Sequence, residues 1–360
     1  MNNLESIYFS ILRSALWDTP LLLPSPLSKE IWNEIYAISK EQTVTGIMLD
    51  AISKLPPEQK PPTELLLKWI MQQRFIEQKN VTMNKVLTEL IKDFNNNDIQ
   101  VYVLKGQSVA QNYPNPKHRI CGDIDLYFKE KDFDKAVEFL KSQGCSIEGN
   151  PNETHYETLY NDIKLELHKK SSTFFTNRLQ KKYNNITSTV IEKERAFETI
   201  NDTEIEVLPY EANTLQLLSH MLRHIITAGL GLRQVCDWVL YTNKYLNDSN
   251  KEQFLTNIKE LELLQTYKAI SAIATDYLGL PKEKVVCEIN DKDKKLAKKV
   301  FKIIMEYGNF GHYGEHSQPQ NKWEYIKVFA WKMGNCIRLH KLAKSETRNY
   351  LFWKYHFVDD

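Results

Sequence analysis

The sequence predicts an α+β protein, with a core of alternating strands and helices between an N-terminal and a C-terminal helical region. Three observations favour this class. Apolar residues recur at helical spacing over residues 1–95, strand-like and helical runs alternate over 96–209, and helical spacing returns over 210–360. No segment repeats at a fixed period, which argues against a solenoid or a propeller. We therefore expect three regions with these boundaries.

The N-terminal region is expected to consist of helices separated by prolines. A proline inside a helix lacks the amide donor and clashes with the preceding turn, so the prolines between 20 and 26 and those between 56 and 62 mark connections. Thr63 is the expected N-cap of a long helix over 63–95, because its hydroxyl could accept a bond from a free amide of the first turn.

A change in the apolar period from 3.6 towards 2 marks the start of the core. Asn and Asp at 95–98 favour a turn, and the β-branched run after them favours a strand. Downstream of Pro209 helical spacing continues to the C-terminus. Over residues 96–209 strand-like and helical runs alternate, which is typical of an α/β or α+β core. The expected elements are the strand Ile99–Leu104, a helix near Ser108–Tyr113, the strand Ile124–Phe128, the helix Phe133–Gln143, and the strands Ser146–Glu148, His155–Tyr160 and Ile163–His168.

Composition limits the classes of function. The chain has 47 Lys and Arg against 46 Asp and Glu, so its net charge of +1 gives no overall case for wrapping nucleic acid. Its five cysteines are scattered without a C-x-x-C pair, which predicts reduced thiols and neither a disulfide framework nor a thiolate zinc site. There is no basic leader before an apolar run and no window of about 18 apolar residues. We therefore expect a cytoplasmic protein without a transmembrane segment.

Acidic residues on two expected strands carry the chemistry. Side chains alternate along a strand, so Asp123 and Asp125 share one face while Ile124 points to the other. By the same rule Glu166 and His168 share one face of the later strand. If the two strands are neighbours, three carboxylates converge. Convergent carboxylates repel one another unless a proton or a cation neutralises them, and hard oxygen ligands favour Mg²⁺ or Mn²⁺.

The segment before these acids suits a nucleotide's phosphates. A strand that breaks at Gly106 and continues into a helix near Ser108 presents backbone N–H groups to an anion. Lys105 and Arg119 would add positive charge. Each also has a plainer alternative, because Lys105 is equally an exposed lysine at a strand end and Arg119 equally a salt-bridge partner of Asp123. Two divalent ions at the carboxylates could clamp the phosphates and activate an attacking hydroxyl.

The motifs LKG, R-x-x-x-DID and ELH resemble those of the bacterial uncharacterised nucleotidyltransferase family, within the DNA polymerase β superfamily. The similarity covers roughly residues 60–245. It implies a small mixed polymerase β-like sheet, a Gly-Ser type loop on the helix after the first strand, a D-x-D metal pair on the next strand and a third carboxylate on a later one.

Carried over by position, Gly106 and Ser108 match the phosphate loop, Asp123 and Asp125 the metal pair, and Glu166 the third metal ligand. In the family's mechanism this third carboxylate would act as base towards the acceptor hydroxyl. The chain departs from the pattern in two ways. A glutamine stands between the glycine and the serine of the loop, and the third carboxylate is Glu instead of the commoner Asp.

Four further residues are candidates for the substrate side of the cleft. His168 is either a hydrogen-bond donor to the carboxylates or a catalyst. His220 and His224 have the spacing of a zinc pair on a helix, but no H-E-x-x-H pattern or flanking Cys supports zinc, so we expect them to line the cleft. Arg233 is expected there too, although an i,i+4 ion pair with Asp237 is the favoured alternative.

The basic and aromatic C-terminal stretch 322–357 leaves two alternatives open. It has eight Lys and Arg against two acids, interleaved with Trp and Phe. Such a composition can serve nucleic acid or an anionic membrane surface. We favour the alternative of packed helices with a solvated basic face.

These observations together predict a metal-dependent nucleotidyltransferase, an enzyme that transfers an NMP from an NTP to an unknown acceptor hydroxyl or phosphate and releases pyrophosphate, with Mg²⁺ or Mn²⁺ as cofactor. One alternative is a catalytically silent scaffold or partner-binding protein of the same fold. The intact carboxylates disfavour it, because buried acids without a cation destabilise a protein. A D-x-D glycosyltransferase using a nucleotide sugar ranks lower, because those enzymes usually begin with a nucleotide-binding βαβ unit and this chain begins with about 95 helical residues.

Overall fold

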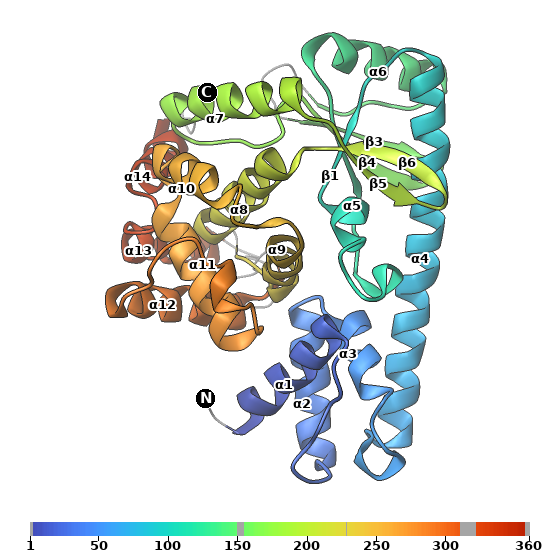
Figure 1. The fold of residues 1–360 in the computed structure, drawn as a ribbon, viewed down its shortest axis with the longest axis vertical. Coiled ribbons are helices and arrows are strands. Elements are labelled where there is room, and N and C mark those ends of the chain that lie inside the picture. Colours follow the sequence, from blue (N-terminus) through green and yellow to red (C-terminus); the bar gives the residue numbers. More distant parts are fainter. Residues whose placement is uncertain (1–2, 150–154, 228, 310–321, 357–360) are drawn as a thin grey trace.

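The computed structural model describes residues 3–149, 155–227, 229–309 and 322–356. They form one six-stranded sheet and a larger number of helices (Figure 1). The strands are β1 Tyr102–Leu104, β2 Ile124–Tyr127, β3 His155–Tyr160, β4 Ile163–His168, β5 Ala196–Ile200 and β6 Thr203–Val207. The helices are α1 Asn3–Trp17, α2 Lys29–Glu41, α3 Thr45–Ile52, α4 Thr63–Asn96, α5 Gly106–Ala110, α6 Glu130–Ser142, α7 Asn177–Lys193, α8 Tyr210–Thr227, α9 Leu232–Tyr245, α10 Lys251–Glu260, α11 Leu264–Tyr277, α12 Asp291–Tyr307, α13 Lys322–Leu339 and α14 Lys344–His356.

The sheet is mixed, with strand order β3-β4-β2-β1-β6-β5. An antiparallel hairpin closes each edge, formed by β3 with β4 and by β5 with β6. In the centre, β1 pairs antiparallel with β2, whereas β2 pairs in parallel with β4 and β1 in parallel with β6. The predicted α+β fold with a small mixed sheet is therefore confirmed, with helical regions before and after the sheet along the chain.

The two faces of the sheet have different environments. On one face the apolar side chains of β2 and β4, among them Leu126 and Leu167, pack against α4 and α6 around Phe94 and Phe133. These are the side chains that strand alternation predicts to face the core. The opposite face carries the acidic residues of β2 and β4, and α7 and α8 contribute to a separate small core beside β1.

The helices before and after the sheet share one apolar core. Side chains of α1, α2 and α3 pack in the same cluster as those of α8, α9, α11 and α12. The 34-residue helix α4 connects this core to the sheet: its first half contacts α3, with the Trp69 indole donating to the carbonyl of Thr45 at 2.8 Å, and its second half covers the sheet. In Figure 1 α4 runs along one side of the molecule past both parts.

Several boundaries differ from those that the sequence predicts. Pro62 is the N-cap of α4 and Thr63 its first helical residue, without a side-chain capping bond, so the predicted cap is wrong by one residue. The predicted strand at 146–148 is reduced to a single bridge between Glu148 and Glu157. The helix α7 and the strands β5 and β6 were not predicted. Asn201 and Asp202 join the two strands with positive φ angles of 46° and 60°, so this Asn-Asp pair was a usable hairpin signal.

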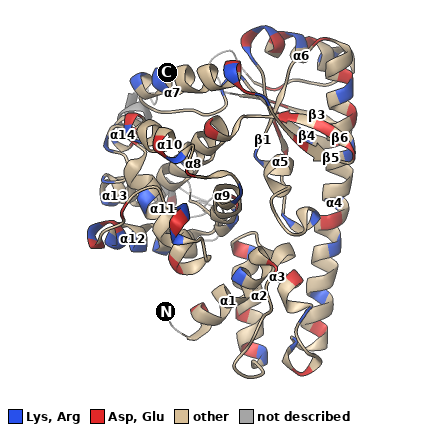
Figure 2. Ribbon diagram, in the orientation of Figure 1, with Lys and Arg blue, Asp and Glu red and all other residues tan. Residues whose placement is uncertain are grey.

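The C-terminal helices α13 and α14 contact the rest of the fold through specific groups. The Trp331 indole donates to the Tyr307 hydroxyl at 2.7 Å, and the buried Glu346 carboxylate accepts from the backbone amides of Phe175 and Thr176 at 2.8 and 2.9 Å. Trp323 remains 76% exposed. Basic and acidic residues are interspersed along the helices in the view of Figure 2. No helix in the described part of the chain is both long and apolar enough to cross a membrane.

Candidate functional site

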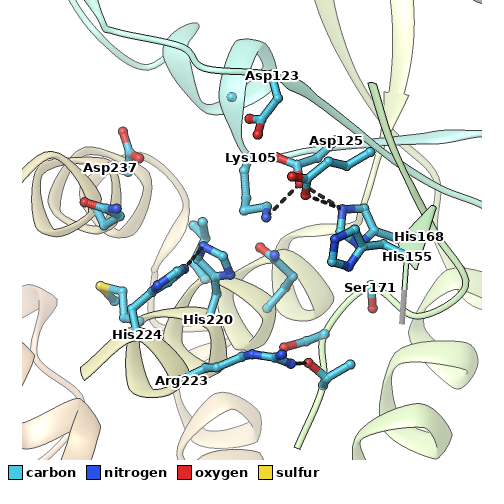
Figure 3. Close-up of a pocket in the computed structure, with 18 of the residues that line it drawn as sticks. Lys105, Asp123, Asp125, His155, His168, Ser171, His220, Arg223, His224 and Asp237 are labelled. Carbon is cyan, nitrogen blue, oxygen red and sulfur yellow. Dashed lines mark hydrogen bonds and ion pairs between the residues drawn. The ribbon is translucent and has the colours of Figure 1, made fainter. Parts of the chain in front are cut away.

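A cavity of about 340 Å³ lies between the acidic face of the sheet and helices α8 and α9. That volume is at the lower end of the range for small-molecule sites. Every site residue predicted from the sequence lines this cavity except Ser108. Figure 3 shows Asp123, Asp125 and His168 on one side of it and His220, His224 and Arg223 on the other.

Strand register brings two of the predicted carboxylates together. β2 and β4 are parallel neighbours, and Asp125 is the pairing partner of Glu166. One ligand atom each from Asp125, Glu166 and His168 lies within 4.8 Å of the others. Asp123 immediately precedes β2 and faces the same cavity, although it is outside that closest group. The expected convergence of acids therefore occurs, with a histidine added to it.

The carboxylate of Asp125 is compensated by two donors. The Lys105 ammonium lies 2.9 Å from one of its oxygens, and His168 Nε2 lies 2.8 Å from the same oxygen. Burial alone would raise the pKa of Asp125, but the Lys105 charge and the His168 hydrogen bond hold it well below the usual range. Burial lowers the pKa of His168, and its bonds to Asp125 and Glu166 reverse this effect and raise it. Lys105 is thus a partner of the acids and not a solvated lysine.

Asp123 has the opposite environment. Burial and the negative charges of Asp125 and Glu166 raise its pKa from 3.8 to about 6, because Lys105 offsets them only in part. Burial also raises the pKa of Glu166, but the hydrogen bond from His168 leaves it below its ordinary value. A divalent cation would relieve the repulsion that disfavours ionised Asp123, so this donor set of oxygens and one imidazole fits Mg²⁺ or Mn²⁺.

Lys105 and Gly106 make the turn that brings β1 to the cavity. Both have positive φ angles, 44° and 37°, which allow the chain to pass directly from the strand into α5. Gly106 lines the cavity as predicted. Ser108 does not: it is buried, and its hydroxyl donates to the Lys105 carbonyl at 2.7 Å. The Ser108 side chain therefore makes a structural bond that stabilises the turn, and the place of Ser108 in a phosphate loop stays a prediction.

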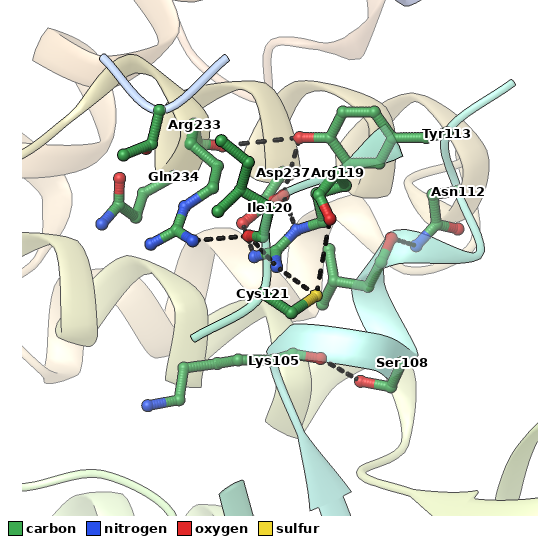
Figure 4. Close-up of polar contacts among 12 residues, drawn as sticks. Lys105, Ser108, Asn112, Tyr113, Arg119, Ile120, Cys121, Arg233, Gln234 and Asp237 are labelled. Carbon is green, nitrogen blue, oxygen red and sulfur yellow. Dashed lines mark hydrogen bonds and ion pairs between the residues drawn. The ribbon is translucent and has the colours of Figure 1, made fainter. Parts of the chain in front are cut away.

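Arg119 forms a buried ion pair that its place in the sequence did not indicate. Its Nε and Nη2 donate to the two carboxylate oxygens of Asp237 at 2.8 and 2.6 Å, and the Tyr113 hydroxyl donates to the same group at 2.7 Å (Figure 4). The predicted alternative of a pair with Asp123 is wrong, and so is the pairing of Arg233 with Asp237. The expected contact of Arg119 with phosphate stays a prediction: Arg119 lines the cavity, and a bidentate carboxylate already binds its guanidinium.

Arg233 lines the cavity with its charge uncompensated by any carboxylate that the structure describes within 4.0 Å. Its Nη1 donates to the carbonyl of Ile120 at 2.5 Å, which directs the guanidinium beside the segment leading to Asp123 (Figure 4). Burial lowers the pKa of Arg233, and the nearby Arg119 lowers it further. A buried cation in this position favours an anionic ligand.

His220 and His224 lie on the wall opposite the acids, as expected. Their Nε2 atoms are 3.0 Å apart. Burial lowers the pKa of both rings, and the positive charge of Lys105 lowers it further, so the pair is neutral at pH 7. Neither residue belongs to any of the possible metal-binding groups among the described residues.

Several cavity residues were not predicted from the sequence, among them two on α8 and one on the loop after β4. Gln216 and Arg223 lie on the same face of α8 as His220, and Thr173 lies on the loop after β4. The spacing of Gln216 and Arg223 around His220 was a usable sequence signal, since positions i, i+4 and i+7 share one helix face. For Thr173 no sequence signal was present, because only the tertiary fold brings its loop to α8.

Comparison with known proteins places the chain in a family. The model of the family described as "uncharacterised nucleotidyltransferase" matches residues 28–279. Among solved structures, a nucleotidyltransferase-like antigenic protein from Paracoccidioides brasiliensis is similar at 12% sequence identity with a TM-score of 0.35, over 55% of this chain and 92% of that one. No curated protein matches the chain. Because the family match spans well over half of the sequence, this protein belongs to the uncharacterised nucleotidyltransferase family.

Proposed function

We propose that this protein is a metal-dependent nucleotidyltransferase that transfers an NMP from an NTP to an acceptor oxygen and releases pyrophosphate. One observation carries the proposal: the parallel pairing of β2 with β4 sets Asp125 beside Glu166, with Asp123 on the same cavity. Three carboxylates that face one cavity repel each other, and membership of a nucleotidyltransferase family offers a reason for this unfavourable arrangement.

Asp123, Asp125 and Glu166 would hold Mg²⁺ or Mn²⁺, with His168 fixing the orientation of two of them. When bound, the metal supplies charge for the phosphates and acidifies the attacking hydroxyl. Lys105, whose ammonium contacts Asp125 at 2.9 Å, would add positive charge for the triphosphate.

The remaining residues position the reactants. Gly106 presents its backbone to the triphosphate, and Arg233 adds the positive charge that the sequence suggested for Arg119. The acceptor oxygen attacks the α-phosphorus, the bond to the bridging oxygen of pyrophosphate breaks, and the acceptor's proton passes to the Glu166 carboxylate. Arg119 and Asp237 act indirectly, by fixing the segment that ends at Asp123.

Two assays test the proposal. The first is incubation with each α-³²P-labelled NTP, Mg²⁺ or Mn²⁺ and a cell extract, followed by separation of labelled products. The second is the melting temperature with metal and a non-hydrolysable NTP analogue, which should rise only for a working site. The wild type is compared with Asp123→Asn and with Asp134→Asn, a matched change of an exposed aspartate on α6.

We expect metal-dependent label transfer and a rise in melting temperature for the wild type and Asp134→Asn, both lost in Asp123→Asn. If no label moves and no NTP analogue raises the melting temperature, the silent scaffold is the better description. If a labelled nucleotide sugar donates its sugar and no NTP donates its NMP, the glycosyltransferase alternative replaces this proposal.

A further inference from the structure

The wall of the cavity formed by α8 carries an arginine that makes no direct ion pair with a described acid. Arg223 lines the cavity, and no carboxylate within 4.0 Å pairs with it in the described part of the chain. Its Nη1 donates to the Thr173 hydroxyl, and its guanidinium carbon lies 5.6 Å from the centre of the Phe175 ring. These contacts fix the direction of the side chain (Figure 3), and the Glu346 carboxylate offsets its charge only from a distance, without a direct ion pair. An arginine held in this way has donors left for a planar contact with an anion.

A second residue on the same helix face has a side-chain oxygen without a hydrogen-bond partner among the described residues. Gln216 precedes Arg223 by seven residues, lines the cavity and is only 1% exposed. Its amide oxygen is buried and accepts no hydrogen bond from any described residue. Leaving such an acceptor unsatisfied is unfavourable, so a ligand that brings a donor, such as a hydroxyl, would be stabilised here.

The position of these two residues relative to the carboxylates identifies the substrate that they face. Thr173, which contacts Arg223, lies on the loop directly after β4, the strand that carries Glu166. Ser172 on the same loop is bonded to Ser219 of α8 at 2.7 Å, which holds the loop against this helix. The contact with Thr173 therefore attaches Arg223 to the loop that follows the strand of Glu166, whereas the Lys105–Gly106 turn, assigned to the triphosphate, follows β1.

We propose that Arg223 and Gln216 form the acceptor subsite and that the acceptor is a phosphorylated polyol, with its phosphoryl group at Arg223 and a hydroxyl at Gln216. The inference rests on the proposed function. An in-line reaction places the acceptor opposite the leaving pyrophosphate, which is the Glu166 side of the cavity. A free hydroxyl of the acceptor attacks the α-phosphorus, its proton passes to Glu166, and the products are a phosphodiester and pyrophosphate.

The first test measures binding by calorimetry in the presence of Mg²⁺ and a non-hydrolysable NTP analogue. The probes are inorganic phosphate and glycerol 3-phosphate, with glycerol as the uncharged control. We expect both phosphates to bind the wild type, Arg223→Gln to weaken them at least tenfold, and Arg223→Lys to restore part of the loss. Arg178→Gln, a change of an exposed arginine paired with Glu262, is the matched control that should leave binding unchanged.

Three outcomes of this test overturn the inference. Failure of both phosphates to bind the wild type, or equal binding by the wild type and Arg223→Gln, means that no anion site exists at Arg223. If Arg223→Gln instead weakens the NTP analogue, the residue belongs to the triphosphate. Phosphate binding is repeated without nucleotide, so that a failure of the proposed function, in which no analogue binds, is distinguished from a failure of this subsite.

The second test uses transfer of label into a small-molecule extract divided into two halves. One half is treated with alkaline phosphatase, which is then removed. We expect the labelled product only in the untreated half, with a yield at least tenfold lower for Arg223→Gln and several-fold lower for Gln216→Leu. Equal transfer in both halves would show that the acceptor needs no phosphoryl group and would refute the inference.

Discussion

Asp123 and Asp125 are two residues apart, yet the same substitution should change the free energy of unfolding in opposite directions. The pKa of Asp123 is raised from 3.8 to about 6 because its ionised form is buried among other acids. At about 1.36 kcal/mol per pKa unit, this difference destabilises the folded protein by about 3 kcal/mol at a pH where Asp123 is ionised in both the folded and the unfolded state. Asparagine imitates the neutral acid, so Asp123→Asn should stabilise the metal-free protein by up to about 3 kcal/mol at pH 7.

Asp125→Asn should have the reverse effect. The carboxylate of Asp125 is buried and bonded to Lys105 and His168, so removal of its charge leaves Lys105 without its ion-pair partner and His168 with only Glu166 at 3.5 Å. Breaking a buried ion pair in this way costs about 3–5 kcal/mol. The opposite signs follow from the positions of the donors, since Lys105 and His168 contact Asp125 directly and not Asp123.

The assay is urea denaturation at pH 4 and pH 7, without metal, for both variants and for the Asp134→Asn control. The sign of the pH effect is fixed by the raised pKa: the native state keeps the Asp123 proton below about pH 6, whereas the unfolded chain loses it near 3.8. The stabilisation by Asp123→Asn should therefore fall below about 1 kcal/mol at pH 4. Equal effects at the two pH values, or destabilisation by Asp123→Asn at pH 7, would refute this account.

Three further substitutions test other parts of the structure by chemical denaturation. Arg119→Met leaves Asp237 buried without its bidentate partner and should cost about 3–5 kcal/mol; a loss below about 1 kcal/mol would contradict a buried pair. Gly46→Ala would place a Cβ 2.2 Å from a backbone carbonyl oxygen, so we expect a loss of about 1–3 kcal/mol in spite of the better helix propensity of alanine, and a gain in stability would disprove the close contact. His168→Gln should destabilise by about 1.5–3 kcal/mol at pH 6 and by less at pH 9. The raised pKa of His168 means that its bond to Asp125 contributes fully below pH 6.5 and is lost as the pH rises through that pKa, so a pH-independent loss would refute the charged bond.

Alternation along single strands determines much of the site from the sequence alone. It places Asp123 with Asp125, and Glu166 with His168, because the side-chain period of a strand is fixed at two by its backbone. The same local rule predicts β3 and β4 at their observed residues. The 3.6-residue period likewise predicts α4 to within one residue, since a long helix with one apolar face repeats its signal many times.

The partners of those residues are decided by the tertiary structure alone. Which strand lies beside β2 depends on the packing of the whole sheet, and only the parallel pairing with β4 sets Glu166 next to Asp125. Arg119 pairs with Asp237 across 118 residues, a choice that no local spacing encodes, although Arg233 was the nearer candidate in sequence. The sequence specifies which side chains share a face, because the backbone period is local, whereas the long-range packing of α8 and α9 on the sheet decides which faces meet and which charges remain free for a ligand.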